Sequence, residues 1–172
     1  NEAIVPINEN LHLLPSSLDN SQVESVLNSH QSINITSFFD DLLSSAKSDY
    51  DLIVMDCPPS INKITVCAAC FASINLIPLN ADVDSFDGVV ITVSEIEKIE
   101  RSFKNLSMKM NYKIVFNKYD AREKLTLNIM GSISERQNLK DNLLPIVIRT
   151  NTSFKNSKAD GEYIFDVSKS TA

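Results

Sequence analysis

The fold class is decided by one stretch of this sequence, Asp49-Tyr50-Asp51-Leu52-Ile53-Val54-Met55-Asp56-Cys57-Pro58-Pro59-Ser60. Leu52 to Met55 is a short apolar run, the pattern of a strand that is buried on both faces of a parallel sheet. Asp56 closes the run at its carboxyl end, where open α/β sheets bind their ligands. Pro58 and Pro59 cannot continue a strand, because proline lacks a backbone N–H. The stretch predicts a buried strand that ends on a carboxylate and then turns sharply.

A carboxylate at that position suits a hydrated magnesium ion, which keeps several waters and takes few protein oxygens. An ordinary strand that ends in a solvated aspartate would look the same up to Asp56. The Pro58-Pro59-Ser60 sequel makes the pattern more specific. Asp56 is therefore our candidate metal residue, with magnesium bound through water.

These residues resemble the Walker B region of the ParA/MinD family of partition and positioning ATPases, which commonly reads Y-D, a hydrophobic run, then D-x-P-P-S. Other segments match the family in the same order along the chain. They are Leu11 to Ser17 (L-x-L-I-P-S), Ile74 to Leu79 (V-L-I-P), Asp87-Gly88-Val89 (E-G-L), Tyr119-Asp120-Ala121-Arg122 ([FY]-D-x-R), and Ile148-Arg149 with Gly161 (I-R … G). The resemblance covers nearly the whole chain.

The phosphate-binding loop of that family is not among these residues. The sequence holds neither G-x-x-x-x-G-K-[ST] nor the variant K-G-G-x-G-K-[ST], and its three glycines, Gly88, Gly131 and Gly161, are too scattered to cradle phosphates. The chain also opens without Met, and Asp166 to Ala172 resembles a final helix cut short. The resemblance thus implies a single ParA-type domain over residues 1–172, truncated at both ends and lacking the N-terminal Walker A unit.

The order of apolar segments predicts α/β architecture. Because strands alternate with helices, we expect right-handed crossovers and a parallel sheet. The resemblance makes this a three-layer, mostly parallel sheet flanked by helices, of the P-loop NTPase type (SIMIBI class). We expect strands at 11–14, 51–56, 74–79, 112–117 and 144–148, helices at 21–29, 35–47, 61–72, 87–101 and 125–139, and at 150–162 a surface loop that can hold a short helix.

Composition favours one globular domain in a reducing compartment. The chain has 172 residues, of which 43% are hydrophobic, and it contains no apolar run long enough to cross a bilayer and no visible signal peptide. Cys57, Cys67 and Cys70 are an odd number of thiols, so a cytoplasmic location is the default. Cys67 and Cys70 have C-x-x-C spacing, but helical spacing places both on one buried face as small hydrophobes, and no second pair completes a zinc set.

Charge is divided unevenly along the chain. Residues 1–100 carry 3 Lys or Arg against 15 Asp or Glu, whereas residues 101–172 carry 13 against 7. This asymmetry indicates a basic face despite the net charge of −6. The family resemblance implies non-specific contacts to DNA phosphates from Arg122, Arg149, Lys155 and Lys158. Ser153 stands where the family often has arginine, so a neighbouring lysine would have to compensate.

Asn117-Lys118-Tyr119-Asp120 has the N-K-x-D pattern with which many GTP-binding proteins read a base. Asparagine can pair with a purine edge through both its donor and its acceptor. Four common residues make a weak motif, and the resemblance accounts for Tyr119 and Asp120 without guanine. We interpret Asn117 as a nucleotide-binding residue that contacts adenine.

The resemblance implies a partition ATPase for plasmids or chromosomes, with ATP and Mg²⁺ as cofactors. Asp56 would be catalytic, and Cys57, Pro58, Pro59 and Ser60 would form a switch that senses the γ-phosphate. The intact protein would form an ATP-sandwich homodimer, bind DNA non-specifically at the nucleoid in the cytoplasm, and be stimulated by a ParB-like partner. This chain alone would be inactive.

Two alternatives remain open. One is a MinD-like positioning ATPase on a membrane, which would need a C-terminal amphipathic helix. The other is a non-catalytic remnant of a partition protein that acts as an interaction module.

Overall fold

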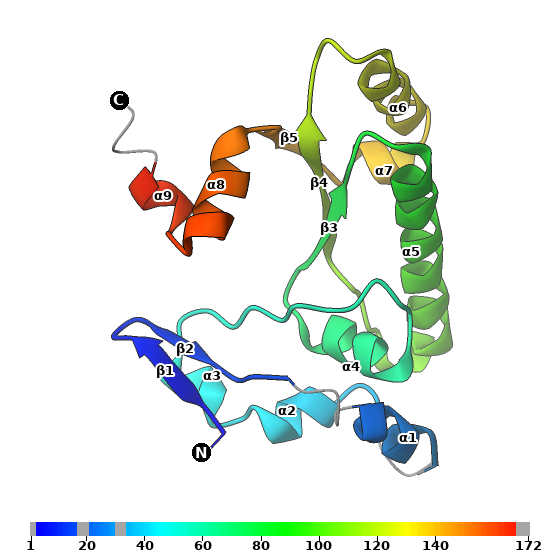
Figure 1. Ribbon diagram of the computed structural model, residues 1–172. Coiled ribbons are helices and arrows are strands. Elements are labelled where there is room, and N and C mark those ends of the chain that lie inside the picture. The colour runs from blue at the N-terminus through cyan, green and yellow to red at the C-terminus, as the bar shows by residue number, and fades with distance from the viewer. Residues whose placement is uncertain (1–2, 17–20, 30–33, 168–172) are drawn as a thin grey trace. The chain divides into compact units, whose positions relative to one another are not determined.

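The computed structural model describes residues 3–16, 21–29 and 34–167, and it divides the chain into two compact units, 1–72 and 73–172. The expected final helix from Asp166 onward lies largely outside the described residues. Figure 1 labels the helices and strands of both units.

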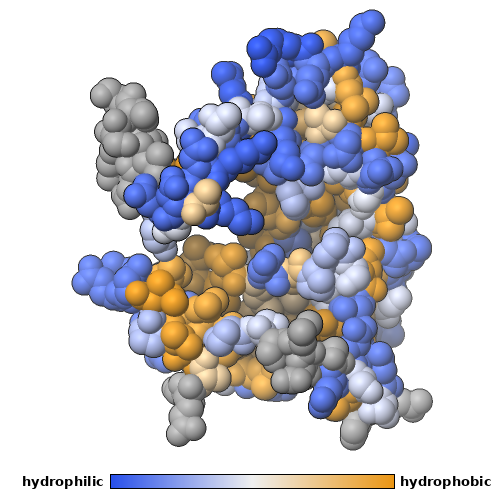
Figure 2. Space-filling model, in the orientation of Figure 1, coloured by the Kyte–Doolittle hydropathy of each residue, from blue (hydrophilic) through white to orange (hydrophobic). Residues whose placement is uncertain are grey.

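The first unit opens with a hairpin that the sequence did not predict in full. β1 (Val5–Asn8) pairs antiparallel with β2 (Leu11–Leu13), and the Asn8 side chain accepts the Asn10 N–H at 2.9 Å in the turn. Apolar side chains on both strands are about half exposed. Figure 2 shows hydrophobic surface, in orange, over this hairpin. The strand expected at 11–14 is confirmed, but its partner is an antiparallel neighbour.

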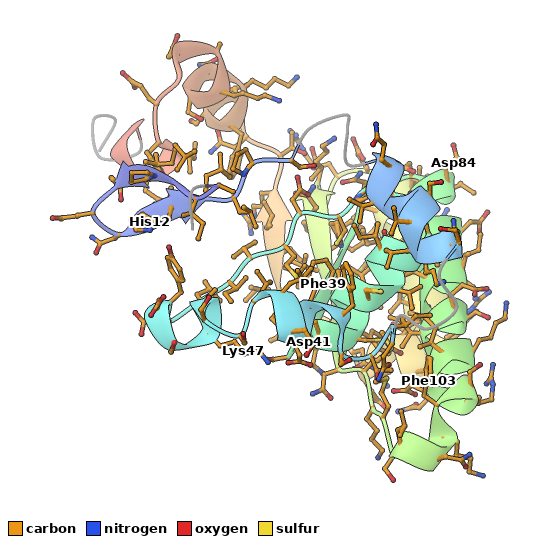
Figure 3. The ribbon with its side chains drawn as sticks, turned by 90° about the horizontal axis from the view of Figure 1, so that it is seen from below. His12, Phe39, Asp41, Lys47, Asp84 and Phe103 are labelled. Carbon is orange, nitrogen blue, oxygen red and sulfur yellow. The ribbon has the colours of Figure 1, made fainter. Side chains whose placement is uncertain are left out.

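The other regular elements among the described residues of this unit are helices. They are α1 (Ser21–Ser29), α2 (Phe38–Leu42), α3 (Ala46–Asp49) and α4 (Lys63–Phe71). Leu27 of α1 and Cys67 of α4 are almost fully buried, and Phe39 of α2 packs toward Phe71 of α4 with ring centroids 6.0 Å apart (Figure 3).

The single helix expected at 35–47 is wrong, because the chain forms two short helices there. Serines surround the break, and they bond to nearby backbone carbonyls. The Ser44 hydroxyl donates to Asp41 O at 3.4 Å, and the Ser48 hydroxyl donates to Ser45 O at 2.7 Å. Such local bonds compete with helical ones.

The buried strand expected at 51–56 is also wrong. In this unit the segment runs as irregular chain with no strand paired to it among the described residues, and Leu52 and Val54 are 77% and 81% exposed. Ile53 and Met55 are half buried, so exposure alternates as it does on an extended chain. A strand is defined by ladder bonds to a neighbour, and an apolar run cannot supply that neighbour.

The second unit contains the parallel sheet that the sequence predicts. Its strand order is β3 (Asn75–Leu79), β4 (Tyr112–Tyr119), β5 (Leu143–Arg149), with both pairings parallel. The helices are α5 (Val83–Ser102), α6 (Lys124–Ser134), α7 (Gln137–Lys140), α8 (Thr152–Asp160) and α9 (Ile164–Val167), with a 3₁₀ turn at Lys104–Leu106.

The core of this unit lies between the sheet and three helices. Leu79, Ile114 and Phe116 are fully buried on the strands, and they pack against Val89 and Val93 of α5, Ile129 and Ile133 of α6, and Leu139 of α7. Figure 1 shows α5 lying along the sheet. This core fixes the carboxyl ends of β3 and β4, where the polar groups of the candidate site stand.

Two helix boundaries differ from expectation in this unit. The helix expected from Asp87 begins at Val83, because Asp82 caps it by accepting the Ser85 N–H at 2.6 Å. The helix expected at 125–139 divides into α6 and α7, which Glu135 and Arg136 separate. Residues 150–162, expected as a surface loop that can hold a short helix, contain α8, which Asn151 caps and Gly161 ends in the left-handed region at φ 68°.

Candidate functional site

Asp56 lies in the first unit, exposed on the irregular chain that precedes α4. Cys57, Pro58, Pro59 and Ser60 follow it and are exposed as well. Partial burial raises the pKa of the Cys57 thiol, and the neighbouring Asp56 carboxylate raises it further. This stretch is therefore open to a ligand, and Cys57 is a neutral thiol rather than an activated nucleophile.

The turn connects directly to the start of α4. Asn62 accepts the Thr65 N–H at 3.0 Å as the helix cap, and its amide donates to the Ser60 hydroxyl at 3.5 Å and to Glu24 Oε2 at 3.2 Å. One asparagine thus holds the last residue of the turn, the first turn of α4 and a side chain of α1. A movement of the turn would reach both helices through Asn62.

Asn117 stands near the carboxyl end of β4 in the second unit, and its Nδ2 donates to Asn80 Oδ1 at 3.1 Å. The strand register pairs Leu79 with Phe116, which places Asn80 beside Asn117 one residue further on. Sequence reasoning missed Asn80. The sequence did contain a signal for this pair, because an asparagine stands near the carboxyl end of each of these two apolar strands.

Lys118, the residue after Asn117, adopts φ 53°, which is uncommon outside glycine. The β4–β5 register shifts here, and the Thr150 hydroxyl donates to Lys118 O at 3.1 Å. Irregularities of this kind redirect side chains at strand ends. The regular ladder of hydrogen bonds therefore ends at the carboxyl edge of this sheet, where the candidate site residues lie.

Arg122 follows β4 in an exposed loop and is held by Asp120. Its Nε and Nη2 donate to the two carboxylate oxygens at 2.9 and 2.6 Å, and its backbone N–H donates to Oδ1 at 3.0 Å. These bonds hold the pKa of Asp120 well below its usual range. The Arg122 side chain is nevertheless 89% exposed, so it is oriented but still accessible. Sequence reasoning placed Arg122 in a loop and missed the pairing.

The remaining predicted cations lie at the end of β5 and on α8. Arg149 is the last residue of β5 and pairs in register with Tyr119, so it lies beside the start of the Arg122 loop. Lys155 and Lys158 are exposed on α8, three residues apart and hence on one helix face. Ser153 donates its N–H to Asn151 Oδ1 at 2.9 Å in the helix cap, a local structural role.

The structure therefore brings Asn117 together with Asn80, and Arg149 together with the loop that carries Arg122, all on one sheet edge. Asp56 and the turn of residues 57–60 belong to the other unit. No described part of the chain holds a cluster of three or more metal-binding side chains. A lone exposed carboxylate fits a magnesium ion that keeps its water shell, whereas no segment of this sequence forms a phosphate cradle.

The C-x-x-C pair lies on α4. Cys67 is buried and Cys70 is half buried, and burial raises the pKa of Cys70 to about 11, with a smaller effect from Cys67. Redox-active C-x-x-C thiols have lowered pKa values, so these residues have the character of small core hydrophobes. Within the described residues, no helix is both long and apolar enough to cross a membrane.

Comparison with known proteins places the chain in a family. The AAA domain family model matches residues 1–112. The chain is 26% identical over 125 residues to the chromosome-partitioning ATPase Soj of Treponema pallidum, covering 73% of this chain and 48% of Soj. It is also 26% identical over 123 residues to the cell division protein PomZ of Myxococcus xanthus, covering 72% of this chain and 37% of PomZ. The chain thus spans about half or less of the length of these relatives.

Solved structures share the fold at lower identity. Apo McdA of Cyanthece superposes with a TM-score of 0.78 at 18% identity, covering 96% of this chain and 66% of McdA. Cobyrinic acid a,c-diamide synthase of Mycobacterium smegmatis with ADP and magnesium gives 0.69 at 21% identity, covering 87% and 58%. The predicted α/β class, a parallel sheet flanked by helices, is confirmed. This chain belongs to the AAA domain family, in its ParA/MinD group.

Proposed function

We propose that this chain supplies the magnesium-facing carboxylate, the switch turn, the base contact and the DNA-binding cations of a ParA-type partition ATPase. The observation that carries the proposal is the order of polar groups along the carboxyl edge of the sheet. Amides stand at the ends of β3 and β4, and cations stand at the ends of β4 and β5 and on α8. Open α/β sheets bind ligands at this edge.

Asp56 would hold magnesium through water, and bound to a triphosphate the ion would neutralise phosphate charge. Cys57 to Ser60 would follow the state of the γ-phosphate, and the Asn62 contacts would carry that state into α4 and α1. Loops that order and release in this way couple hydrolysis to a partner. The phosphate cradle would come from outside this chain.

Arg122, Arg149, Lys155 and Lys158 would bind DNA phosphates. Such contacts are independent of sequence and sensitive to salt. A homodimer would place two such faces on one duplex and raise the apparent affinity without new contacts. A ParB-like partner would stimulate hydrolysis and release the DNA, and the protein would be found on the nucleoid.

The test uses the protein from its complete reading frame. Phosphate release from ATP is measured with magnesium, with and without two unrelated DNA duplexes, and vesicles of anionic lipid are assayed in parallel. Magnesium-dependent hydrolysis and ATP-dependent retention of both duplexes support the proposal. Retention on vesicles but not on DNA would favour the MinD-like alternative, and absence of nucleotide binding would favour the non-catalytic remnant.

A further inference from the structure

The side-chain amides of Asn80 and Asn117, here named the amide couple, form a contact with a defined direction. Asn117 Nδ2 is the donor and Asn80 Oδ1 is the acceptor, at 3.1 Å. An asparagine amide has two N–H groups and one carbonyl oxygen. Within the described part of the chain, Asn117 is thus left with one N–H and its oxygen to offer to a ligand.

Both members of the amide couple stand on rigid supports. Each directly follows a fully buried residue, Leu79 on β3 or Phe116 on β4, and these two residues are paired in register. The Asn80 backbone N–H donates to the Ser85 hydroxyl at 2.9 Å, and Ser85 is in turn fixed by Asp82 at the start of α5. Such preorganised supports keep a binding group in one orientation.

The direction of the contact selects between purines. Adenine presents an acceptor, N7, next to a donor, the N6 amino group, whereas guanine presents two acceptors, N7 and O6. An amide left with one donor and one acceptor complements the adenine edge. The reverse direction, with the Asn117 amide rotated by 180°, would exchange the positions of its N–H groups and its oxygen, and the order of donor and acceptor would no longer match the adenine edge.

We propose that Asn80 is a positioning residue that fixes the Asn117 amide and thereby makes the site select adenine over guanine nucleotides. This rests on the proposed function, in which Asn117 contacts the base. Asn80 itself need not touch the nucleotide. Its effect should therefore follow from whether residue 80 offers an oxygen acceptor, and not from the size of the side chain.

The experiment measures equilibrium binding of ATP and of GTP to the full-length protein by isothermal titration. The variants are Asn117→Leu, Asn80→Leu, Asn80→Ala and Asn80→Asp, the last of which keeps the acceptor. Asn111→Leu is the matched control, because Asn111 is an exposed asparagine at the amino end of the same strand, with its amide donating to Ser73 O at 3.4 Å. Circular dichroism checks that each variant is folded.

We expect the wild type, Asn111→Leu and Asn80→Asp to prefer ATP. In Asn80→Leu and Asn80→Ala the preference should fall by about threefold to tenfold, the range of one net hydrogen bond. In the nucleotide-free wild type, the side-chain amide proton of Asn117 that bonds to Asn80 should also resonate downfield of its position in Asn80→Leu.

The outcomes distinguish failure of the base contact by Asn117 from failure of the positioning role of Asn80. If Asn117→Leu leaves the ATP preference unchanged, the base contact in the proposed function is wrong. If Asn117→Leu abolishes the preference while Asn80→Leu and Asn80→Ala retain it, the base contact stands and the role of Asn80 is overturned. A wild type that prefers GTP would overturn the proposed selection of adenine.

Discussion

Individual residues at this site act in pairs. Arg122 lies against Asp120 and Asn117 against Asn80, so in each case the neighbour decides what the predicted residue can offer a ligand. These neighbours, Asp120 and Asn80, could not be identified as partners from the sequence, where they are only common residue types near strand ends. Asp56 differs, because it is exposed in its unit and its proposed partner is a ligand rather than a side chain.

Replacing Asp56 tests its predicted role. In the full-length protein Asp56→Ala should abolish ATP hydrolysis, because the water-held magnesium loses its carboxylate. The fold should remain, since an exposed side chain leaves no core cavity when it is removed. Phosphate release and circular dichroism measure the two effects. Asp51→Ala, an exposed aspartate of the same stretch, should turn over normally, and normal turnover of Asp56→Ala would remove Asp56 from the site.

The pH dependence of thiol alkylation tests the character of the C-x-x-C pair. The pKa of Cys70 is raised to about 11, so its reactive thiolate is scarce at neutral pH and grows as pH rises toward that value. We expect iodoacetamide to modify the exposed Cys57 first, and Cys70 at a rate that climbs steeply above pH 9. Mass spectrometry assigns each site. Fast alkylation of Cys70 at pH 7 would instead indicate a lowered pKa and a redox role.

At the scale of elements, apolar periodicity predicted the sheet of the second unit, and in the first unit it predicted α1 and α4 but failed at residues 51–56. β3, β4 and β5 were expected close to their observed bounds, and β3 and β4 carry the fully buried side chains of the core, Leu79, Ile114 and Phe116. The segment at 51–56 has the same apolar signal but no paired neighbour among the described residues of its unit, and pairing is a non-local property. Helix ends were missed where caps decided them, as at Asp82 and Asn151.

Removal of the Asp82 cap tests the observed start of α5. Asp82→Ala should lower the free energy of unfolding by about 1 kcal/mol, because the Ser85 N–H loses its acceptor. Urea denaturation followed by circular dichroism measures the change. Asp87→Ala replaces an exposed aspartate that lies inside the same helix and should change stability much less. Equal effects of the two substitutions would contradict the observed start of α5.

The cations after β4 and on α8 can be tested as a DNA-binding edge. In the full-length ATP-bound protein, Arg122→Ala and Lys155→Ala should each weaken DNA binding, and the effect of each variant should be the same for unrelated DNA sequences. Each variant should also lower the slope of log affinity against log salt concentration by about one. Arg122→Ala also leaves the Asp120 carboxylate without its cation, so it should have the larger effect on affinity. Filter binding over a salt series measures both quantities.

Lys109→Ala is the control for that series, because Lys109 is exposed just before the amino end of β4, away from the carboxyl edge. It should keep the affinity and slope of the wild type. If Arg122→Ala and Lys155→Ala behave like this control, the DNA-binding cations lie elsewhere.

Over the whole molecule, charge is segregated along the chain. Residues 1–72 hold 2 Lys or Arg against 9 Asp or Glu, and residues 73–172 hold 14 against 13. Neither unit is strongly basic, so attachment to DNA would depend on the local arrangement of cations rather than on net charge. Strong dependence on the bound nucleotide is then expected, because dimerisation must bring two weak faces together.

The chain taken alone should neither bind ATP tightly nor hydrolyse it. Its 172 residues contain no phosphate-binding loop, and one carboxylate with one base-facing amide cannot hold a charged triphosphate. Isothermal titration of ATP with magnesium into the 172-residue protein should give no heat of specific binding. Low-micromolar affinity would mean that another part of this chain binds the phosphates.

The most direct test of the account is the DNA affinity of the full-length protein with ATP, with ADP and without nucleotide. We predict tight binding to two unrelated duplexes with ATP, a steep loss of affinity with salt, and at least tenfold weaker binding in the other two states, which corresponds to a coupling of about 1.4 kcal/mol or more. Equal affinity in all three nucleotide states, or binding confined to one sequence, would contradict the account.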